Sequence, residues 1–233
     1  MFPQPLVDIS YKFQHHRKPI VLGFMGKAGA GKDTAFQLME KIFGGSRFAF
    51  ADRMKAGLKA MGLEEPPREL KEENLPGEDF SYRDAGQDLG TKWGRGLDPM
   101  FWVNRLDNDR KALGRNLADE AYYNNRGLIA WITDVRFQEE VDYIHANYGY
   151  VIGLNGRKYG MTATAGAHAS ETQPIIPDFN VWNVGTELDL EFQLMQVLVL
   201  VAHLYKMQKG VYGLDACRLL QAYALHHNNA GAA

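Results

Sequence analysis

The sequence predicts an α/β fold in which helices cover both faces of a doubly wound parallel sheet. Short apolar runs rich in β-branched residues alternate with segments of helical periodicity, as in repeated strand–helix units. The run from Leu128 to Thr133 is apolar up to its last residue, as expected for a strand buried on both faces. At 233 residues the chain has the length of one such domain with appended segments.

The expected elements alternate along the chain. Strands are predicted over residues 20–25, 47–50, 128–133, 150–154 and 181–184. Helices are predicted over residues 33–43, 52–61, 82–95, 99–123, 139–148 and 187–207. Asp98 followed by Pro99 forms an N-cap and first-turn pair at the start of the fourth of these helices.

Two segments interrupt this alternation. The segment 62–79 contains EEPPRELKEENLPGED, whose density of proline and charge predicts an exposed flap. The segment 155–178 is rich in glycine and polar residues and too long for a simple connection, which indicates a lid. We therefore expect a single domain over residues 1–233, with a helical insertion at 62–127 and a lid at 155–178.

Composition limits the setting and the partners. Hydrophobic residues make up 45% and charged residues 23%, and the net charge of −2 argues against nucleic-acid or membrane binding through bulk charge. The single Cys217 excludes an intrachain disulfide and fits a reducing compartment. The first 19 residues lack the apolar core of a signal peptide, and the apolar run Leu194–Leu204 is shorter than the ~20 residues that span a bilayer. We expect a cytoplasmic protein, and the sequence leaves the oligomeric state open, a homodimer included.

A glycine-rich loop follows the first strand. Gly26–Lys32 reads GKAGAGK and matches the phosphate-loop pattern G-x-x-x-x-G-K. In such a loop the backbone N–H groups surround phosphate oxygens, and the following helix adds the partial positive charge of its N-terminus. The ATP-binding candidates are Gly26, Gly29, Ala30, Gly31 and Lys32, with Lys32 reaching the β- and γ-phosphates. A glycine-rich turn without a ligand is the alternative, but the position between a strand and a helix favours phosphate binding.

The next two residues depart from the usual pattern. Asp33 stands where a Ser or Thr hydroxyl normally coordinates Mg²⁺. Its carboxylate could serve the metal directly or through water, or it could simply stabilise the helix dipole. Thr34 could supply the hydroxyl instead, and the sequence does not choose between the two residues.

A second acidic candidate lies at the tip of the buried strand 128–133. Asp134 has the position from which such strands hold Mg²⁺ or its waters, and Arg136 could neutralise charge on a transferred phosphoryl group. An exposed Asp134–Arg136 ion pair of little energy is the alternative. Together with the loop, these residues predict a phosphotransferase in which Lys32, Asp134 and Arg136 are catalytic candidates.

Five stretches resemble the phage-type deoxynucleoside monophosphate kinases, a branch of the P-loop nucleoside monophosphate kinases. They are GKAGAGKDT (26–34), FADRMK (50–55), YRDAGQDLGTKWGR (82–95), ITDVRFQEE (132–140) and HASE (168–171). The resemblance implies a P-loop NTPase-type sheet and an enzyme that moves the γ-phosphate of ATP, with Mg²⁺, to a deoxynucleoside 5′-monophosphate. That family often has Ser where this chain has Ala30, so a backbone contact must replace a hydroxyl contact here.

The resemblance also places the acceptor. Arg83, Gln87 and Gly90 share a face of the predicted helix 82–95, where Arg83 could hold the acceptor phosphate as a further catalytic residue. Gln87 could read a base edge, and Gly90 allows close approach of the backbone. Trp102 could stack on the base. Core packing is the alternative for Gln87 and Trp102.

Further residues follow from the same resemblance. Asp52 and Lys55 come just after the strand 47–50, where open α/β sheets gather ligands, and Lys55 could bind the acceptor phosphate. Helix capping by Asp52 and a solvated Lys55 are the alternatives. The remaining acceptor candidates are Thr91, Asp134, Arg136 and Glu140, and Arg157 at the root of the lid is an ATP-binding candidate. His168, Ser170 and Glu171 match a family signature to which the sequence assigns no role.

Two other functions stay open. A P-loop kinase of another small metabolite would have the same core, and a non-catalytic nucleotide-binding module would share the loop. A GTP-dependent switch is disfavoured because the sequence lacks an N-K-x-D motif. A phage-encoded protein of this kind would act in the host cytoplasm.

Overall fold

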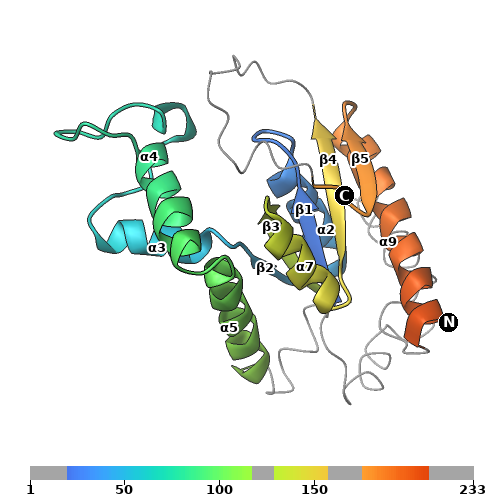
Figure 1. Cartoon of the computed structure of the whole chain (residues 1–233). Coiled ribbons are helices and arrows are strands. Elements are labelled where there is room, and N and C mark those ends of the chain that lie inside the picture. The colour runs from blue at the N-terminus through green and yellow to red at the C-terminus, as the bar shows by residue number, and fades with distance from the viewer. Residues whose placement is uncertain (1–19, 117–128, 157–174, 210–233) are drawn as a thin grey trace. The chain divides into compact units, whose positions relative to one another are not determined.

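The computed structural model describes residues 20–116, 129–156 and 175–209 (Figure 1). The chain forms two compact units. Of the described residues, 20–47, 114–116, 129–156 and 175–209 belong to the first unit, and Phe48–Leu113 to the second. Each unit is described by itself below.

The first unit is built on a five-stranded parallel sheet with the order β2-β3-β1-β4-β5. Its strands are β1 (Ile20–Met25), β2 (Ser46–Phe48), β3 (Ile129–Val135), β4 (Tyr150–Gly156) and β5 (Phe179–Asn183). The central strand β1 pairs in parallel with both β3 and β4, and β4 pairs in parallel with β5. The predicted parallel α/β sheet is therefore confirmed.

Helices cover both faces of this sheet. They are α2 (Lys32–Phe43), α7 (Gln138–Ala146) and α9 (Glu187–Lys209), and Figure 1 shows α2 and α7 on opposite faces. Leu22 and Phe24 of β1 lie in the fully buried core with residues of α2 and α9. Gly23 faces the other way, and a Cβ there would lie 2.5 Å from Cδ1 of Ile144 in α7. The alternation along β1 thus gives each face its own helix layer.

The main core is fixed by a large aromatic residue of β3. Trp131 is fully buried, and its ring stacks on Phe24 at 5.6 Å with an interplanar angle of 2°. Its indole Nε1 donates a hydrogen bond to the carbonyl oxygen of Gly44 at 2.9 Å, just after α2 ends. One side chain therefore ties the sheet to the C-terminal end of α2.

The second unit consists mainly of helices. They are α3 (Asp52–Ala60), the short 3₁₀ helix η2 (Arg68–Leu70), α4 (Tyr82–Gln87), the π-helix η3 (Asp88–Arg95) and α5 (Phe101–Asn116). The single helix expected over 82–95 is thus a short α-helix continued by a π-helix. Of the helix expected over 99–123, the described part is α5, and residues 117–128 lie outside the described residues.

Asp98 lies in a turn just before α5. Oδ1 of Asp98 accepts a hydrogen bond from the backbone N–H of Met100 at 2.8 Å. The backbone N–H of Phe101 also donates to the carbonyl of Asp98 at 2.8 Å, so Asp98–Phe101 forms a turn that leads into the helix. The helix begins at Phe101, two residues after the predicted first-turn position of Pro99.

Glycines let the helices of the second unit approach closely. Gly86, Gly90 and Gly94 recur every four residues. A Cβ on Gly90 would lie 2.9 Å from Sδ of Met54 in α3, and a Cβ on Gly94 would lie 2.6 Å from Nε1 of Trp102 in α5. Gly94 therefore needs to lack a side chain if the ring of Trp102 is to pack as it does, whereas a side chain at Gly90 would require Met54 to shift.

Within residues 20–116, 129–156 and 175–209, no helix combines the length and the hydropathy needed to cross a membrane, the 23-residue α9 included.

Candidate functional site

The glycine-rich loop links the central strand β1 to α2. Gly26 and Gly31 have φ values of 148° and 97°, which L-amino acids with side chains rarely adopt. A Cβ on Gly26 would also lie 2.6 Å from the carbonyl oxygen of Leu154 in β4. The backbone N–H of Ala30 donates to the carbonyl of Lys27 at 3.1 Å and closes a turn within the loop. The glycines at both ends are therefore required by the conformation of the loop.

Lys32 folds back over this loop. Its Nζ donates hydrogen bonds to the carbonyl oxygen of Gly26 at 2.7 Å and to that of Lys27 at 3.0 Å. The N-cap of α2 is Gly31, which brings no side chain to cap the first turn. An ammonium group and the start of a helix thus lie at the same loop, and both favour an anion.

Two neighbouring strands hold the loop in place. Nδ2 of Asn183, at the end of β5, donates a hydrogen bond to the carbonyl oxygen of Ala30 at 3.0 Å. A Cβ on Gly156, at the end of β4, would lie 2.8 Å from Cα of Ala30. Neither residue was expected from the sequence, because only the strand order reveals that both strands end beside the loop.

A bulge in β3 includes Asp134. Gly23 of β1 pairs with Ile132, but Met25 pairs with Val135, so β3 holds one extra residue between these pairs. Val135 lies beside Gly23 on the face that α7 covers. A bulge interrupts the alternation of side chains between the two faces, and the half-buried Asp134 lies within it. Asp134 thus lies near the carboxyl end of β3, which pairs with the strand that leads into the glycine-rich loop.

Glu140 has a structural role. It is 1% exposed, and its Oε2 accepts hydrogen bonds from the backbone N–H groups of Arg136 at 2.6 Å and of Phe137 at 3.1 Å. These bonds fix the turn between β3 and α7 and so position the half-buried Arg136. Contacts of Glu140 and Arg136 with an acceptor stay predictions.

The oxygen donors beside the loop suit Mg²⁺. Asp33 is exposed and Thr34 half-buried in the first turn of α2, and the half-buried Asp134 lies near the carboxyl end of β3. Within the described residues no group of three or more His, Cys, Asp or Glu side chains forms a metal site. Mg²⁺ commonly takes only one or two protein carboxylates and completes its shell with water and phosphate oxygens. This donor set therefore fits a Mg²⁺ ion bound together with a nucleotide.

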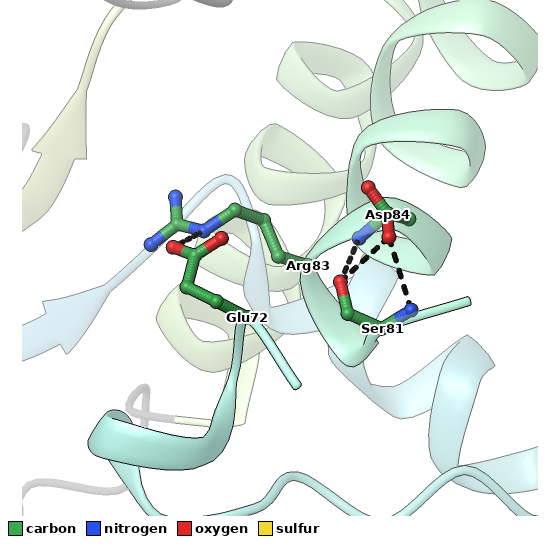
Figure 2. A network of polar contacts seen from close by, with 4 residues as sticks. All are labelled: Glu72, Ser81, Arg83 and Asp84. Atoms are coloured by element: carbon green, nitrogen blue, oxygen red, sulfur yellow. Dashed lines mark hydrogen bonds and ion pairs between the residues drawn. The ribbon is translucent and has the colours of Figure 1, made fainter. Parts of the chain in front are cut away.

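The second unit contains a cluster of three cations, Lys55, Lys71 and Arg83. Nζ of Lys55 lies 3.0 Å from Oε1 of Glu65, and Nζ of Lys71 pairs with the same oxygen. Nε of Arg83 pairs with Glu72, as Figure 2 shows. The structure thus joins the predicted Lys55 and Arg83 to Lys71, which lies in the segment 62–79 that the sequence predicts to be an exposed flap.

The cations alter the ionisation of their partner. Burial raises the pKa of Glu65, but hydrogen bonds and charge from Lys71 and Lys55 outweigh it and leave that pKa below its usual value. Burial and the nearby acids Glu65 and Glu64 raise the pKa of the Tyr82 hydroxyl. The cluster therefore holds a carboxylate in its charged form, as a site for an anion should.

A capping box positions Arg83 at the start of α4. Oγ of Ser81 accepts a hydrogen bond from the N–H of Asp84 at 3.1 Å, and Oδ2 of Asp84 accepts from the N–H of Ser81 at 3.0 Å. The N–H of Arg83 also donates to the carbonyl of Lys71 at 3.1 Å. In Figure 2 the guanidinium extends away from this box toward Glu72.

The other acceptor candidates differ in exposure. Gln87 and Thr91 are half-buried in α4 and η3, and Asp52 is exposed as the first residue of α3, whose N-cap is Ala51. Asp52 is therefore not the N-cap of its helix, and its acidic charge lies in the first turn instead. Contacts of these three residues with a nucleotide stay predictions.

Trp102 and Gly90 pack against each other. Trp102 is 6% exposed, and its Nε1 donates to the carbonyl of Gly90 at 2.7 Å. The structure therefore supports the packing role that the sequence left open for Trp102. Trp93 is 52% exposed and contacts the ring of Phe101 edge to face at 5.2 Å, so it presents more aromatic surface.

Four candidates lie outside the described residues. They are Arg157 at the root of the expected lid, and His168, Ser170 and Glu171 within it.

The fold and these two groups of residues define an α/β protein with a glycine-rich loop at its central strand and a separate cation cluster. No family model and no curated protein matches the chain. Among solved structures, the chain is similar to TT1252 from Thermus thermophilus, with 15% identity over 79% of this chain and 98% of that one. The TM-score is 0.41, which is too low to support an inference about fold or function.

Proposed function

We propose that this protein is a P-loop phosphotransferase that moves the γ-phosphate of ATP to a deoxynucleoside 5′-monophosphate and yields the diphosphate. One observation carries the proposal. The ammonium group of Lys32 lies over the glycine-rich loop between the central strand and α2, bonded to the carbonyl of Gly26 at 2.7 Å. A cation and a helix N-terminus at one glycine-rich loop suit a polyphosphate chain.

The donor half of the reaction belongs to the first unit. The phosphates of ATP bind the backbone of the loop, and Lys32 exchanges its loop carbonyls for β- and γ-phosphate oxygens. Asp134, with Asp33 or Thr34, holds Mg²⁺, which when bound neutralises phosphate charge. Asn183 and Gly156 keep the loop in the conformation that binding needs.

The acceptor half belongs to the second unit. Arg83 and Lys55 bind the 5′-phosphate of the acceptor, since a guanidinium fork and an ammonium both suit phosphate oxygens. Gln87 reads the base edge. A phosphate monoester is already ionised near neutral pH, so its oxygen attacks the γ-phosphorus without a general base. Catalysis then consists of positioning and of charge neutralisation by Lys32 and Arg136.

The cation cluster also favours a second candidate. Lys55 and Arg83, which pair with Glu65 and Glu72, would bind a phosphate monoester and not a base, so a kinase of another phosphorylated small metabolite would use the same cluster. Only Gln87 distinguishes the two candidates. We prefer a nucleoside monophosphate as the acceptor, because the side-chain amide of Gln87 can both donate a hydrogen bond to a base edge and accept one from it.

A substrate panel tests the proposal. The purified protein is incubated with ATP, Mg²⁺ and each deoxy- or ribonucleoside monophosphate, and ADP and the new diphosphate are measured by chromatography. We expect formation of both products in equal amounts with at least one deoxynucleotide. ADP formation that is independent of every monophosphate would contradict the proposal.

A further inference from the structure

The segment between η2 and α4 folds back on itself. The backbone N–H of Leu75 donates to the carbonyl of Phe80 at 2.9 Å, and Asn74 and Ser81 form an antiparallel bridge. The N–H of Arg83 donates to the carbonyl of Lys71 at 3.1 Å. These bonds bring residues 71 and 72 beside residues 82 and 83, so that Glu72 faces Arg83 (Figure 2).

Every cation of the cluster is paired with a carboxylate of one segment. Lys55 and Lys71 share Oε1 of Glu65, and Arg83 pairs with Glu72. Both acids belong to the proline- and charge-rich segment 62–79. The group thus contains three positive and two negative side chains.

The two carboxylates resemble one phosphate group in charge and in chemistry. Together they carry the two negative charges of a phosphate monoester dianion, and their oxygens accept the same charge-assisted hydrogen bonds from Lys and Arg. A guanidinium group fits carboxylate and phosphate with the same planar fork. A phosphate bound by the cluster would therefore compete with the two acids for the same nitrogens.

Exposure favours the exchange. The side chain of Glu72 is 61% exposed, whereas that of Arg83 is 33% exposed and its Nε is buried. The acid can thus swing into solvent while the guanidinium stays in place. An ion pair with so exposed an acid contributes little to stability, so breaking the Arg83–Glu72 pair for a dianion costs little.

We propose that Glu65 and Glu72 occupy the acceptor-phosphate site as carboxylate stand-ins that the incoming phosphate displaces, and that Lys71 is the third cation of this site. The inference rests on the proposed function, in which Arg83 and Lys55 bind the acceptor phosphate. It adds two competing side chains, Glu65 and Glu72, and one further binding residue, Lys71.

Isothermal titration of a deoxynucleoside monophosphate, without ATP, tests the exchange. The double variant Glu65→Gln with Glu72→Gln keeps the shape of both side chains and removes the competing charge. We expect it to bind the monophosphate about tenfold more tightly than the wild type. Adding Lys71→Ala to the double variant should abolish this increase in affinity. Such a loss would show that the increase arises at the cation cluster.

The adjacent acids provide matched controls. The double variant Glu64→Gln with Glu73→Gln removes the same charge from neighbouring positions of the same segment, and it should leave the affinity close to that of the wild type. Equal tightening in this control would show an effect of net charge and overturn the inference.

Arg83→Ala separates the inference from the proposed function. If Arg83→Ala weakens monophosphate binding while the Glu65 and Glu72 double variant binds no more tightly than the wild type, the inference is wrong and the acceptor site stands. If no monophosphate binds to the wild type or to any variant, the proposed function is wrong, and the inference is wrong with it.

Discussion

The indole Nε1 of Trp102 donates a hydrogen bond to the backbone carbonyl of Gly90 at 2.7 Å, in the interior of the second unit. Gly90 belongs to the π-helix η3, whose C-terminal bond from the N–H of Gly96 to the carbonyl of Thr91 spans five residues. The same ring lies against the backbone of Gly94. Trp102 thus holds α5 against a helical segment of rare geometry, of a kind often found near functional sites.

Replacing Trp102 tests whether this ring packs or binds a base. Trp102→Phe keeps an aromatic ring but leaves the buried Gly90 carbonyl without its indole donor, so we expect a loss of about 1–3 kcal/mol in the free energy of unfolding. Urea denaturation measures the loss, and Trp93→Phe at the exposed neighbour is the control. If the free energy of unfolding is unchanged but the order of kcat/KM among the monophosphates changes, Trp102 binds the base.

The capping box of α4 predicts a pH-dependent stability. Hydrogen bonds from the backbone and side chain of Ser81 lower the pKa of Asp84. Its contribution to stability is therefore present above the pKa of the unfolded chain and is lost as the pH falls through the lower folded pKa. Ser81→Ala should cost about 1 kcal/mol at neutral pH, and less in acid, in urea denaturation. A cost that does not shrink in acid would contradict this account.

The sheet and the glycine-rich loop could be predicted because their signals are local. The predicted strand 20–25 coincides with β1, and the helix predicted from Asp33 is α2, since an apolar run, glycines and helical periodicity follow one another directly. The strand predicted at 47–50 is Ser46–Phe48 in the structure. Ala49 and Phe50 are apolar and buried, as strand residues often are, but they lie after the end of the strand. The ends of a strand depend on its hydrogen bonds to neighbouring strands, and the periodicity of the sequence carries no information about those bonds.

The rest of the candidate site depends on contacts between distant segments. Asn183 supports Ala30 across 153 residues, and the bulge that includes Asp134 is seen only in the pairing of β3 with β1. Lys71 lies in a segment whose composition predicts exposure, and only the fold-back of that segment brings it to Lys55 and Arg83 through shared acids. A π-helix differs from an α-helix in its hydrogen-bond register and not in its composition, so η3 could not be foreseen.

Lys32 predicts a large effect on turnover. Lys32→Ala should leave a folded protein and lower phosphoryl transfer by a factor of ~10² to 10³, because the lost charge would face the β- and γ-phosphates. Steady-state kinetics with ATP and a monophosphate measure the loss. Lys27→Ala removes an exposed lysine from the same loop and should be nearly silent. Comparable turnover in both variants would remove Lys32 from the reaction.

Asp33 predicts a change in metal dependence. Asp33→Asn keeps the shape of the side chain at the start of α2 but removes its charge, so activity should fall and recover in part as Mg²⁺ is raised. Titration of activity with Mg²⁺ measures this, with Thr34→Val and Asp134→Asn compared under the same conditions. An unchanged Mg²⁺ dependence in Asp33→Asn would assign the metal to the other two residues.

Arg83 and Gln87 predict different consequences for the acceptor. Arg83→Ala should raise the KM of all monophosphates alike and lower kcat/KM tenfold or more, since a charge-assisted contact contributes roughly 1.5–3 kcal/mol. Gln87→Ala should change the ranking of the bases, because it would touch a base edge and not the phosphate. Neither should much alter the KM of ATP, whose loop lies in the other unit. If both variants lose ATP affinity while the acceptor KM stays constant, these residues belong to the donor site.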